Sequence, residues 1–170
     1  MFDQAGESVL LTQRAFNLKN HPAEAAFPGG MMDDCDSSLI DTLCRELQEE
    51  VGVTSQQISI IEGSDQFISK NGHLVSAYCA QLNQESHQIG LKLCSQEVHK
   101  AEWLSLKSLC QLDNWTYREE LEYFLNNDVG DEEAAFMLSK DFHYKKWNPK
   151  IWGLTAFIFI IFLKRSGIRS

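Results

Sequence analysis

The segment Arg45-Glu46-Leu47-Gln48-Glu49-Glu50 places three glutamates within five positions. On a helix with about 100° per residue, spacings of three and four bring Glu46, Glu49 and Glu50 close together. Carboxylates this close repel one another and raise one another's pKa unless a cation lies among them. Sites built from oxygen ligands suit Mg²⁺ or Mn²⁺. The alternative is a solvated acidic helix face, and the glutamates alone do not separate the two.

The residues on either side of this helix favour the metal-binding interpretation. Gly29 and Gly30 follow Phe27-Pro28, and two glycines allow the backbone to approach a ligand closely. Several residues between Asp33 and Ser38 can cap the start of the helix, and Gly52 occupies the position where a left-handed residue ends one. Together these signals predict a loop–helix–loop over residues 30–53 that binds a divalent cation.

Short apolar runs predict the elements that support this segment. Asn71-Gly72 is a typical hairpin turn between two such runs. Strands and helices that do not alternate strictly predict an α+β domain with a mixed sheet flanked by helices, spanning residues 1–170 as a single domain. Strands are expected at Val9–Leu11, Ile58–Ile61, Leu74–Leu82 and Ala101–Leu104, and a further helix at Glu120–Leu125.

The last apolar run, Ile151 to Leu163, contains a single polar residue, Thr155. A membrane-spanning helix needs about 20 apolar residues, so a run of this length favours a buried helix. Lys164 and Arg165 follow it and suit the C-terminus of a helix. We predict a closing apolar helix over residues 151–165, with a membrane anchor as the alternative.

Composition excludes several classes of partner. The formal net charge of −9 repels nucleic acid and anionic lipid, so neither nucleic-acid nor membrane binding is expected. A small phosphate-bearing substrate stays possible where metal ions mask the charge. The five cysteines have no metal-ligand or disulfide spacing, and Met1 begins no signal peptide, which together predict reduced thiols and a cytoplasmic protein.

The residues from Gly30 to Val53 resemble the Nudix box, in which glycine and an acidic residue precede Arg-Glu-aliphatic-x-Glu-Glu-x-Gly-aliphatic. Asp36 stands where glutamate is usual, and Arg45 arrives one residue late. The positions that match the second half of the box are Arg45, Glu46, Leu47, Glu49, Glu50, Gly52 and Val53.

The late arginine and a second motif are similar to the coenzyme A pyrophosphatase branch of the Nudix hydrolases. Leu10-Leu11-Thr12-Gln13-Arg14-Ala15 and Phe27-Pro28-Gly29-Gly30 match the motif of this branch. Between them, Lys19 replaces the usual arginine and Ala23 the usual glycine. The segment Trp152 to Ala156 also resembles the end of bacterial members.

The resemblance implies an α/β/α Nudix sandwich that hydrolyses coenzyme A, or an acylated form, to 3′,5′-ADP and 4′-phosphopantetheine with Mg²⁺ or Mn²⁺. It implies that Glu46 and Glu50 bind the principal metal with Glu49 alongside, and that Arg45 orients the glutamates. Glu49 or Glu97 would accept the proton of the attacking water. Arg14, Lys19, Gly29 and Gly30 would contact substrate or metal. Because only residues 1–8 precede Val9, the usual N-terminal core strand is expected to be missing.

Two other interpretations remain at this point. A Nudix-fold module could bind a nucleotide without cleaving it. The loop Asp33-Asp34-Cys35-Asp36 could bind calcium, although it lacks the alternating oxygen ligands, the turn glycine and the final glutamate of a calcium-binding loop.

Overall fold

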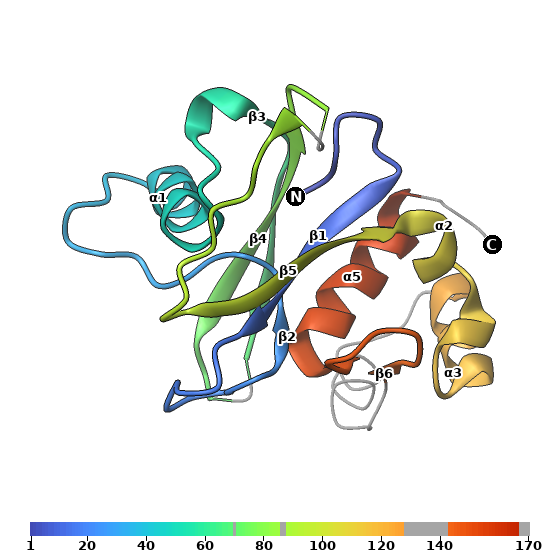
Figure 1. Ribbon diagram of the computed structural model, residues 1–170. Coiled ribbons are helices and arrows are strands. Elements are labelled where there is room, and N and C mark those ends of the chain that lie inside the picture. The colour runs from blue at the N-terminus through green and yellow to red at the C-terminus, as the bar shows by residue number, and fades with distance from the viewer. Residues whose placement is uncertain (70, 86–87, 128–142, 167–170) are drawn as a thin grey trace. The chain divides into compact units, whose positions relative to one another are not determined.

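The computed structural model describes residues 1–69, 71–85, 88–127 and 143–166. The chain divides into two compact units, Met1–Leu104 and Ser105–Ser170. The first unit contains four long strands and the glutamate-bearing helix (Figure 1). Strands and helices coexist without strict alternation, which confirms the predicted α+β class.

Antiparallel pairing organises the strands of the first unit. The first strand, β1 (Ser8–Arg14), lies between β2 (Ala25–Ala26) and β5 (Val98–Ser105). The long hairpin has the register Ile58↔Leu82 at one end and Ile68↔Leu74 at its turn, where Gly72 adopts a φ of 80° as the Asn-Gly signal predicts. The strands are β1 (Ser8–Arg14), β2 (Ala25–Ala26), β3 (Ile58–Ile68), β4 (Leu74–Leu82) and β5 (Val98–Ser105).

Phe2 connects β1 to β4 through its backbone. Its N–H donates to the Ala80 carbonyl at 2.7 Å, and its carbonyl accepts from the Leu82 N–H at 3.0 Å. On the other side Phe2 forms a bridge with Val9. The side chain of Phe2 is buried. The position where the sequence predicts a missing strand therefore contains two residues, Met1 and Phe2, that hydrogen-bond to both neighbours.

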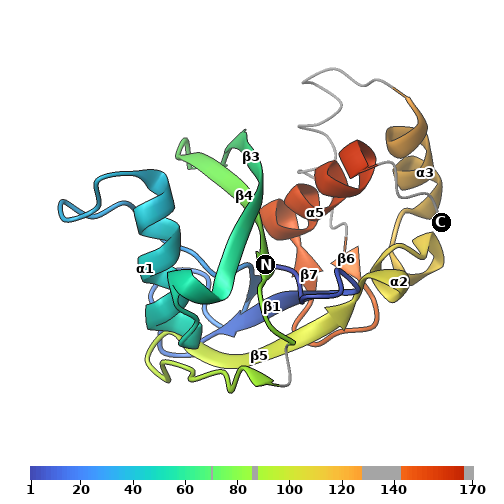
Figure 2. The same ribbon diagram turned by 90° about the horizontal axis from the view of Figure 1, so that it is seen from above.

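The helix α1 (Leu39–Val51) packs against these strands and begins and ends at the expected signals (Figure 2). The Ser38 hydroxyl accepts a hydrogen bond from the Asp41 N–H at 3.1 Å. Gly52, with a φ of 74°, lets its N–H and that of Val53 reach the last carbonyls of the helix. The core beneath combines α1 with all of the long strands: Leu10, Leu47, Val51, Val53, Ile58, Ala80 and Leu82, with Ala101 and Trp103 packed against it.

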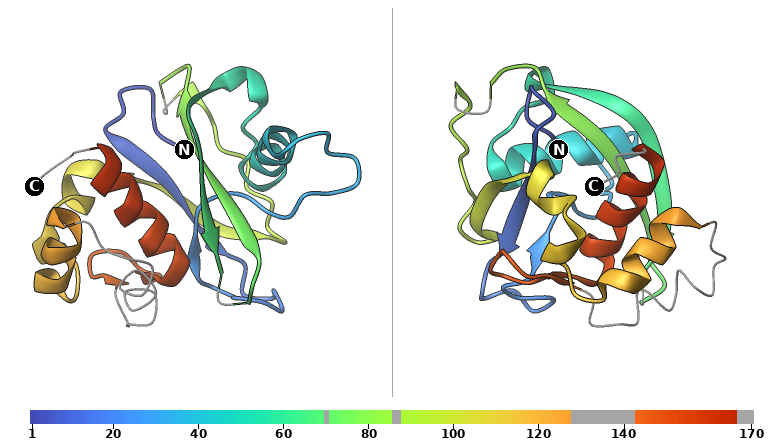
Figure 3. Two further views of the ribbon diagram at one scale, coloured as in Figure 1. Left: turned by 180° about the vertical axis from the view of Figure 1, so that it is seen from behind. Right: turned by 90° about the vertical axis from the view of Figure 1, so that its right-hand side faces the viewer.

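The second unit is mainly helical, and α3 (Arg118–Asn126) and α5 (Gly153–Ser166) lie side by side in it (Figure 3). Trp115, 1% exposed, stacks on Phe159 of α5 and donates its indole N–H to the Leu109 carbonyl. The described part of this unit also contains a short helix and two short strands: α2 (Leu106–Leu109), β6 (His143–Tyr144) and β7 (Ile151–Trp152).

The prediction of a helix from residue 151 is wrong for its first two residues. Ile151 and Trp152 pair antiparallel with Tyr144 and His143, and the helix begins at Gly153. An apolar run has no internal feature that separates a buried strand from a buried helix. Within the described ranges, every helix is too short or too polar to cross a membrane.

Ala23 offers a test of the backbone between β1 and β2. Its φ of 60° lies in the left-handed region, which costs an alanine roughly 1–2 kcal/mol. Glycine relieves this strain, but it also increases the entropy of the unfolded chain, which offsets part of the gain. We therefore expect Ala23→Gly to raise the free energy of unfolding by about 0.5–1 kcal/mol in urea denaturation. Ala26→Gly, in the strand β2, should lower it by about 0.5–1 kcal/mol. A less stable Ala23→Gly variant would contradict the assigned backbone conformation.

Candidate active site

Two carboxylates of α1 are buried side by side with a third from outside the helix. Glu46 is 9% exposed and Glu50 is 5% exposed, so neither belongs to a solvated acidic face. Glu97 lies just before β5 and is partly buried. One carboxylate oxygen from each of the three lies within 4.8 Å of the others. Among the described residues this is the group whose ligand atoms could hold a metal ion.

Backbone hydrogen bonds place Glu97 beside the helix. The Lys92 N–H donates to the Val51 carbonyl at 2.9 Å, and the Cys94 N–H donates to the Glu50 carbonyl at 3.1 Å, so this segment follows the C-terminal end of α1. The Glu97 carbonyl then accepts from the Ala15 N–H at 2.8 Å. The segment before β5 therefore connects the end of α1 to the end of β1 and brings the third carboxylate with it.

The Gly29-Gly30 turn lies directly against the carboxylates. The Gly29 N–H donates to Glu50 Oε2 at 3.2 Å, and Gly29 has a φ of 149°. A Cβ at Gly30 would lie 2.3 Å from Glu46 Oε1, closer than real Cβ contacts allow. A side chain at position 30 would displace the Glu46 carboxylate, so glycine there leaves this carboxylate in its place beside the turn.

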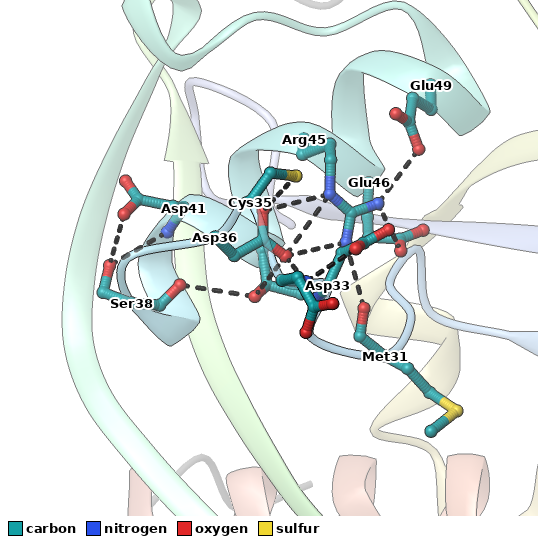
Figure 4. Close-up of polar contacts among 11 residues, drawn as sticks. Met31, Asp33, Cys35, Asp36, Ser38, Asp41, Arg45, Glu46 and Glu49 are labelled. Atoms are coloured by element: carbon teal, nitrogen blue, oxygen red, sulfur yellow. Dashed lines mark hydrogen bonds and ion pairs between the residues drawn. The ribbon is translucent and has the colours of Figure 1, made fainter.

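Arg45 binds the other end of the site through all three of its guanidinium nitrogens (Figure 4). Nε and Nη2 hold Asp36, with Nη2 to Oδ2 at 2.9 Å. Nη1 donates to Glu46 Oε1 at 2.8 Å and to Glu49 Oε2 at 3.0 Å. Nη2 also donates to the Met31 carbonyl at 3.0 Å. The Arg45 guanidinium thus fixes two glutamates of α1 and both ends of the loop that precedes the helix.

Burial and charge shift the pKa values within the site. Burial raises the pKa of Glu50 from 4.5 to about 7; the charges of Glu46 and Glu97 add to the rise, whereas the Gly29 N–H and the Arg14 charge oppose it. Hydrogen bonds from Arg45 hold the pKa of Asp36 far below its usual range. The site thus contains one permanently ionised pair and one buried carboxyl that is poised to lose a proton near neutral pH.

The structure brings together some of the predicted residues and separates others. Glu49 lies outside the carboxylate cluster, is 52% exposed at its side chain and pairs with Arg45. Arg14, at the end of β1, is close enough for its charge to act on Glu50, and its Nε is buried without a hydrogen-bond partner. Lys19 is exposed. Gly29 and Gly30 contact the glutamates.

The donor set fits a hard divalent cation. Three carboxylates with converging oxygens match the ligands that Mg²⁺ and Mn²⁺ prefer. The predicted ligands Glu46 and Glu50 belong to this set and Glu97 completes it, while Glu49 does not. The calcium-loop alternative fits poorly, because both oxygens of Asp36 are bound by Arg45 and Asp33 accepts from the Asp34 N–H.

The central position of Asp36 is a feature that sequence reasoning missed. Its carboxylate accepts from Arg45, from the Thr42 hydroxyl at 3.0 Å and from the Asp33 N–H at 2.9 Å. The separation of nine residues between Asp36 and Arg45 was visible in the sequence, yet only the folded loop shows that they pair.

Comparison with known proteins identifies the family. The sequence model of the NUDIX domain matches residues 1–126. A protein named Nudix hydrolase NudL from Photorhabdus laumondii is 35% identical over 153 residues, which is 89% of this chain and 73% of the relative. A protein of the same name from Salmonella paratyphi B is 49% identical over 53 residues, which cover 31% of this chain and only 28% of that relative.

Solved structures show the same fold. The MutT protein from Methanosarcina mazei aligns over 99% of this chain and 90% of its own with a TM-score of 0.55 and 19% identity. A diadenosine tetraphosphate (Ap4A) hydrolase from Caenorhabditis elegans aligns over 62% of this chain and 76% of its own with a TM-score of 0.51 and 22% identity. With the family match over most of the chain, these findings establish that the chain belongs to the Nudix family and is a Nudix hydrolase.

Proposed function

We propose that this chain hydrolyses the diphosphate linkage of coenzyme A or an acylated coenzyme A, releasing 3′,5′-ADP and 4′-phosphopantetheine. The observation that carries the hydrolytic part is the cluster of buried Glu46 and Glu50 with partly buried Glu97, whose oxygens lie within 4.8 Å of one another. A row of idle carboxylates would not be buried together, since each burial without a cation costs several kcal/mol.

Glu46, Glu50 and Glu97 would hold Mg²⁺ or Mn²⁺. When bound, such a cation neutralises charge on diphosphate oxygens and lowers the pKa of a coordinated water. Arg45 keeps Glu46 in place through a 2.8 Å hydrogen bond, and the Gly29 N–H does the same for Glu50. These contacts preorganise the carboxylates before the substrate arrives.

Glu49 is the glutamate of α1 that the cluster does not include, and we propose that it accepts the proton of the attacking water. The water oxygen forms a bond to one phosphorus, the bridging P–O bond breaks, and the departing phosphate oxygen keeps the electron pair. Arg45 fixes the direction of the Glu49 side chain through a 3.0 Å hydrogen bond. General-base assistance of this kind contributes roughly 10²–10⁴-fold to a rate.

The branch motif supports coenzyme A as the substrate. Arg14 is part of that motif, and its buried Nε is an unused hydrogen-bond donor close to Glu50. Guanidinium groups bind phosphate oxygens bidentately, so Arg14 suits a substrate phosphate. Lys19 is exposed and would add a second positive charge for the 3′-phosphate or the diphosphate.

Product analysis with purified protein tests the reaction and its substrate. With Mg²⁺ or Mn²⁺, purified protein should release 3′,5′-ADP from coenzyme A faster than it cleaves ADP-ribose or diadenosine tetraphosphate, as followed by chromatography of the products. Glu50→Gln, which keeps the shape but removes a ligand charge, should lose metal affinity and activity. Glu49→Gln should lose roughly 10²–10⁴-fold in kcat with metal affinity retained.

Two outcomes would contradict this proposal. Cleavage of the other diphosphates in preference to coenzyme A would reject the substrate. Tight nucleotide binding by folded protein, with no product released and Glu50→Gln behaving as wild type, would favour the non-catalytic alternative.

Gly30→Ala tests the position of the Glu46 carboxylate without destabilising the fold. The new Cβ would lie 2.3 Å from Glu46 Oε1, so the Glu46 carboxylate must move. The exposed backbone at residue 30 can stay where it is. A displacement of about 1 Å in a catalytic group lowers a rate by about 10²-fold, and we expect that loss in kcat with a melting temperature close to wild type. Gly90→Ala is the matched control because a Cβ there meets nothing within 4 Å. Equal activity of the two variants would show that Glu46 needs no fixed position.

The raised pKa of Glu50 predicts a pH dependence of stability in metal-free protein. Between pH 4.5 and about 7 the folded chain holds a proton that the unfolded chain releases, so stability falls as pH rises through this window. Glu50→Gln has no carboxyl group at this position, so its stability lacks this pH dependence. Near pH 8 with a chelator, we expect it to be more stable than wild type by on the order of 3 kcal/mol, and near pH 4.5 to be similar. Thermal melting across pH measures this; a constant difference would contradict the burial of an ionisable Glu50.

A further inference from the structure

Phe16 is an exposed aromatic residue at the edge of the carboxylate site. It follows Arg14 and Ala15 at the end of β1, and 63% of its surface is exposed. Ala15 beside it is buried and donates its N–H to the Glu97 carbonyl. The backbone at Phe16 is therefore tied to the segment that carries the third carboxylate, whereas the phenyl ring faces solvent.

His99 holds the Phe16 ring in a defined position. The two ring centroids are 4.7 Å apart with an interplanar angle of 77°, an edge-to-face arrangement. Such a contact covers at most one face of each ring, so a flat aromatic surface remains open to a ligand. Contacts of this geometry are favourable beyond the area they bury, so they favour one orientation of an exposed ring.

The alternation of β5 puts His99 on the same side as Glu97. Ala101 and Trp103 pack against the core beneath α1, and Val98 is buried but lies outside that core cluster. Odd-numbered positions of β5 therefore face the helix, and His99 continues their row towards Glu97. Two residues along a strand span about 7 Å, which places the aromatic pair a short distance from the carboxylate cluster.

We propose that Phe16, braced by His99, is the surface on which the planar base of the nucleotide substrate stacks. Arg14 precedes Phe16 by two residues, its Nε is buried without a hydrogen-bond partner, and its charge acts on Glu50, so phosphate and base would be bound by neighbouring parts of one chain segment. Stacking of a base on an aromatic side chain contributes about 1–3 kcal/mol and tolerates any base. Phe16 is thus a positioning residue that selects nucleoside diphosphates over other diphosphates. The proposal rests on a nucleotide substrate, and it does not require coenzyme A in particular.

A binding experiment tests this assignment without turnover. AMP and ribose 5-phosphate carry the same phosphate and differ in the base, so the ratio of their dissociation constants reports the contribution of the base. By calorimetry, wild-type protein should bind AMP about 5- to 150-fold more tightly than ribose 5-phosphate. Phe16→Ala should bring the ratio close to one, and Phe16→Trp should restore it.

Ile68→Ala is the matched control, because Ile68 is a large apolar residue with 70% exposure at the turn of the long hairpin, and its loss should leave the ratio at the wild-type value. A ratio unchanged in Phe16→Ala, or a ratio near one in wild type, would overturn the assignment. If coenzyme A is not cleaved but the ratio collapses in Phe16→Ala, the substrate proposal fails and the stacking surface stands. If coenzyme A is cleaved and the ratio does not change in Phe16→Ala, the substrate proposal stands and the stacking surface is rejected.

Discussion

Three carboxylates whose oxygens lie within 4.8 Å of one another, two of them buried and one partly buried, are the constraint on which the first unit depends. Water can no longer screen Glu46 and Glu50, and mutual repulsion adds to the loss of hydration. The chain compensates only in part: Glu46 accepts one hydrogen bond from Arg45, and Glu50 accepts one from Gly29. What remains is an excess of negative charge that fits a divalent cation, so the chain's stability and its chemistry are linked at the same residues.

The same constraint explains the loop between the glycine turn and α1. Residues 31–36 form no helix or strand, and both Met31 and Met32 are exposed, so packing does not hold this loop. Arg45 does, by binding the Met31 carbonyl and Asp36 while it also binds the glutamates of its own helix. The planar guanidinium serves several acceptors at once, which a lysine ammonium could not do in this geometry. Loop and helix are consequently positioned as one structure.

Local signals in the sequence predicted the elements well, and tertiary contacts determined the rest. The bounds of α1 follow from Ser38 and Gly52, whose effects reach only a turn along the chain. Helical spacing alone placed Glu49 with Glu46, because it cannot show which side of the helix the loop covers. Glu97 lies in the cluster because backbone hydrogen bonds join its segment to parts of the chain that are far away in sequence. For the same reason the contact between Phe16 and His99 had no signal in the sequence.

A cluster of carboxylates cannot by itself choose among substrates, since any diphosphate presents similar oxygens to a cation. Selection has to come from residues beyond Glu46, Glu50 and Glu97. The end of β1 is suited to this role, because its backbone is hydrogen-bonded to Glu97, Arg14 has a buried donor without a partner, and Phe16 presents an exposed ring. In the proposed roles, a change at Phe16 alters substrate recognition and leaves the burial of Glu46 and Glu50 intact, whereas a change at Arg14 also removes a charge that acts on Glu50. Recognition at the strand end is then separate from the chemistry at the buried glutamates.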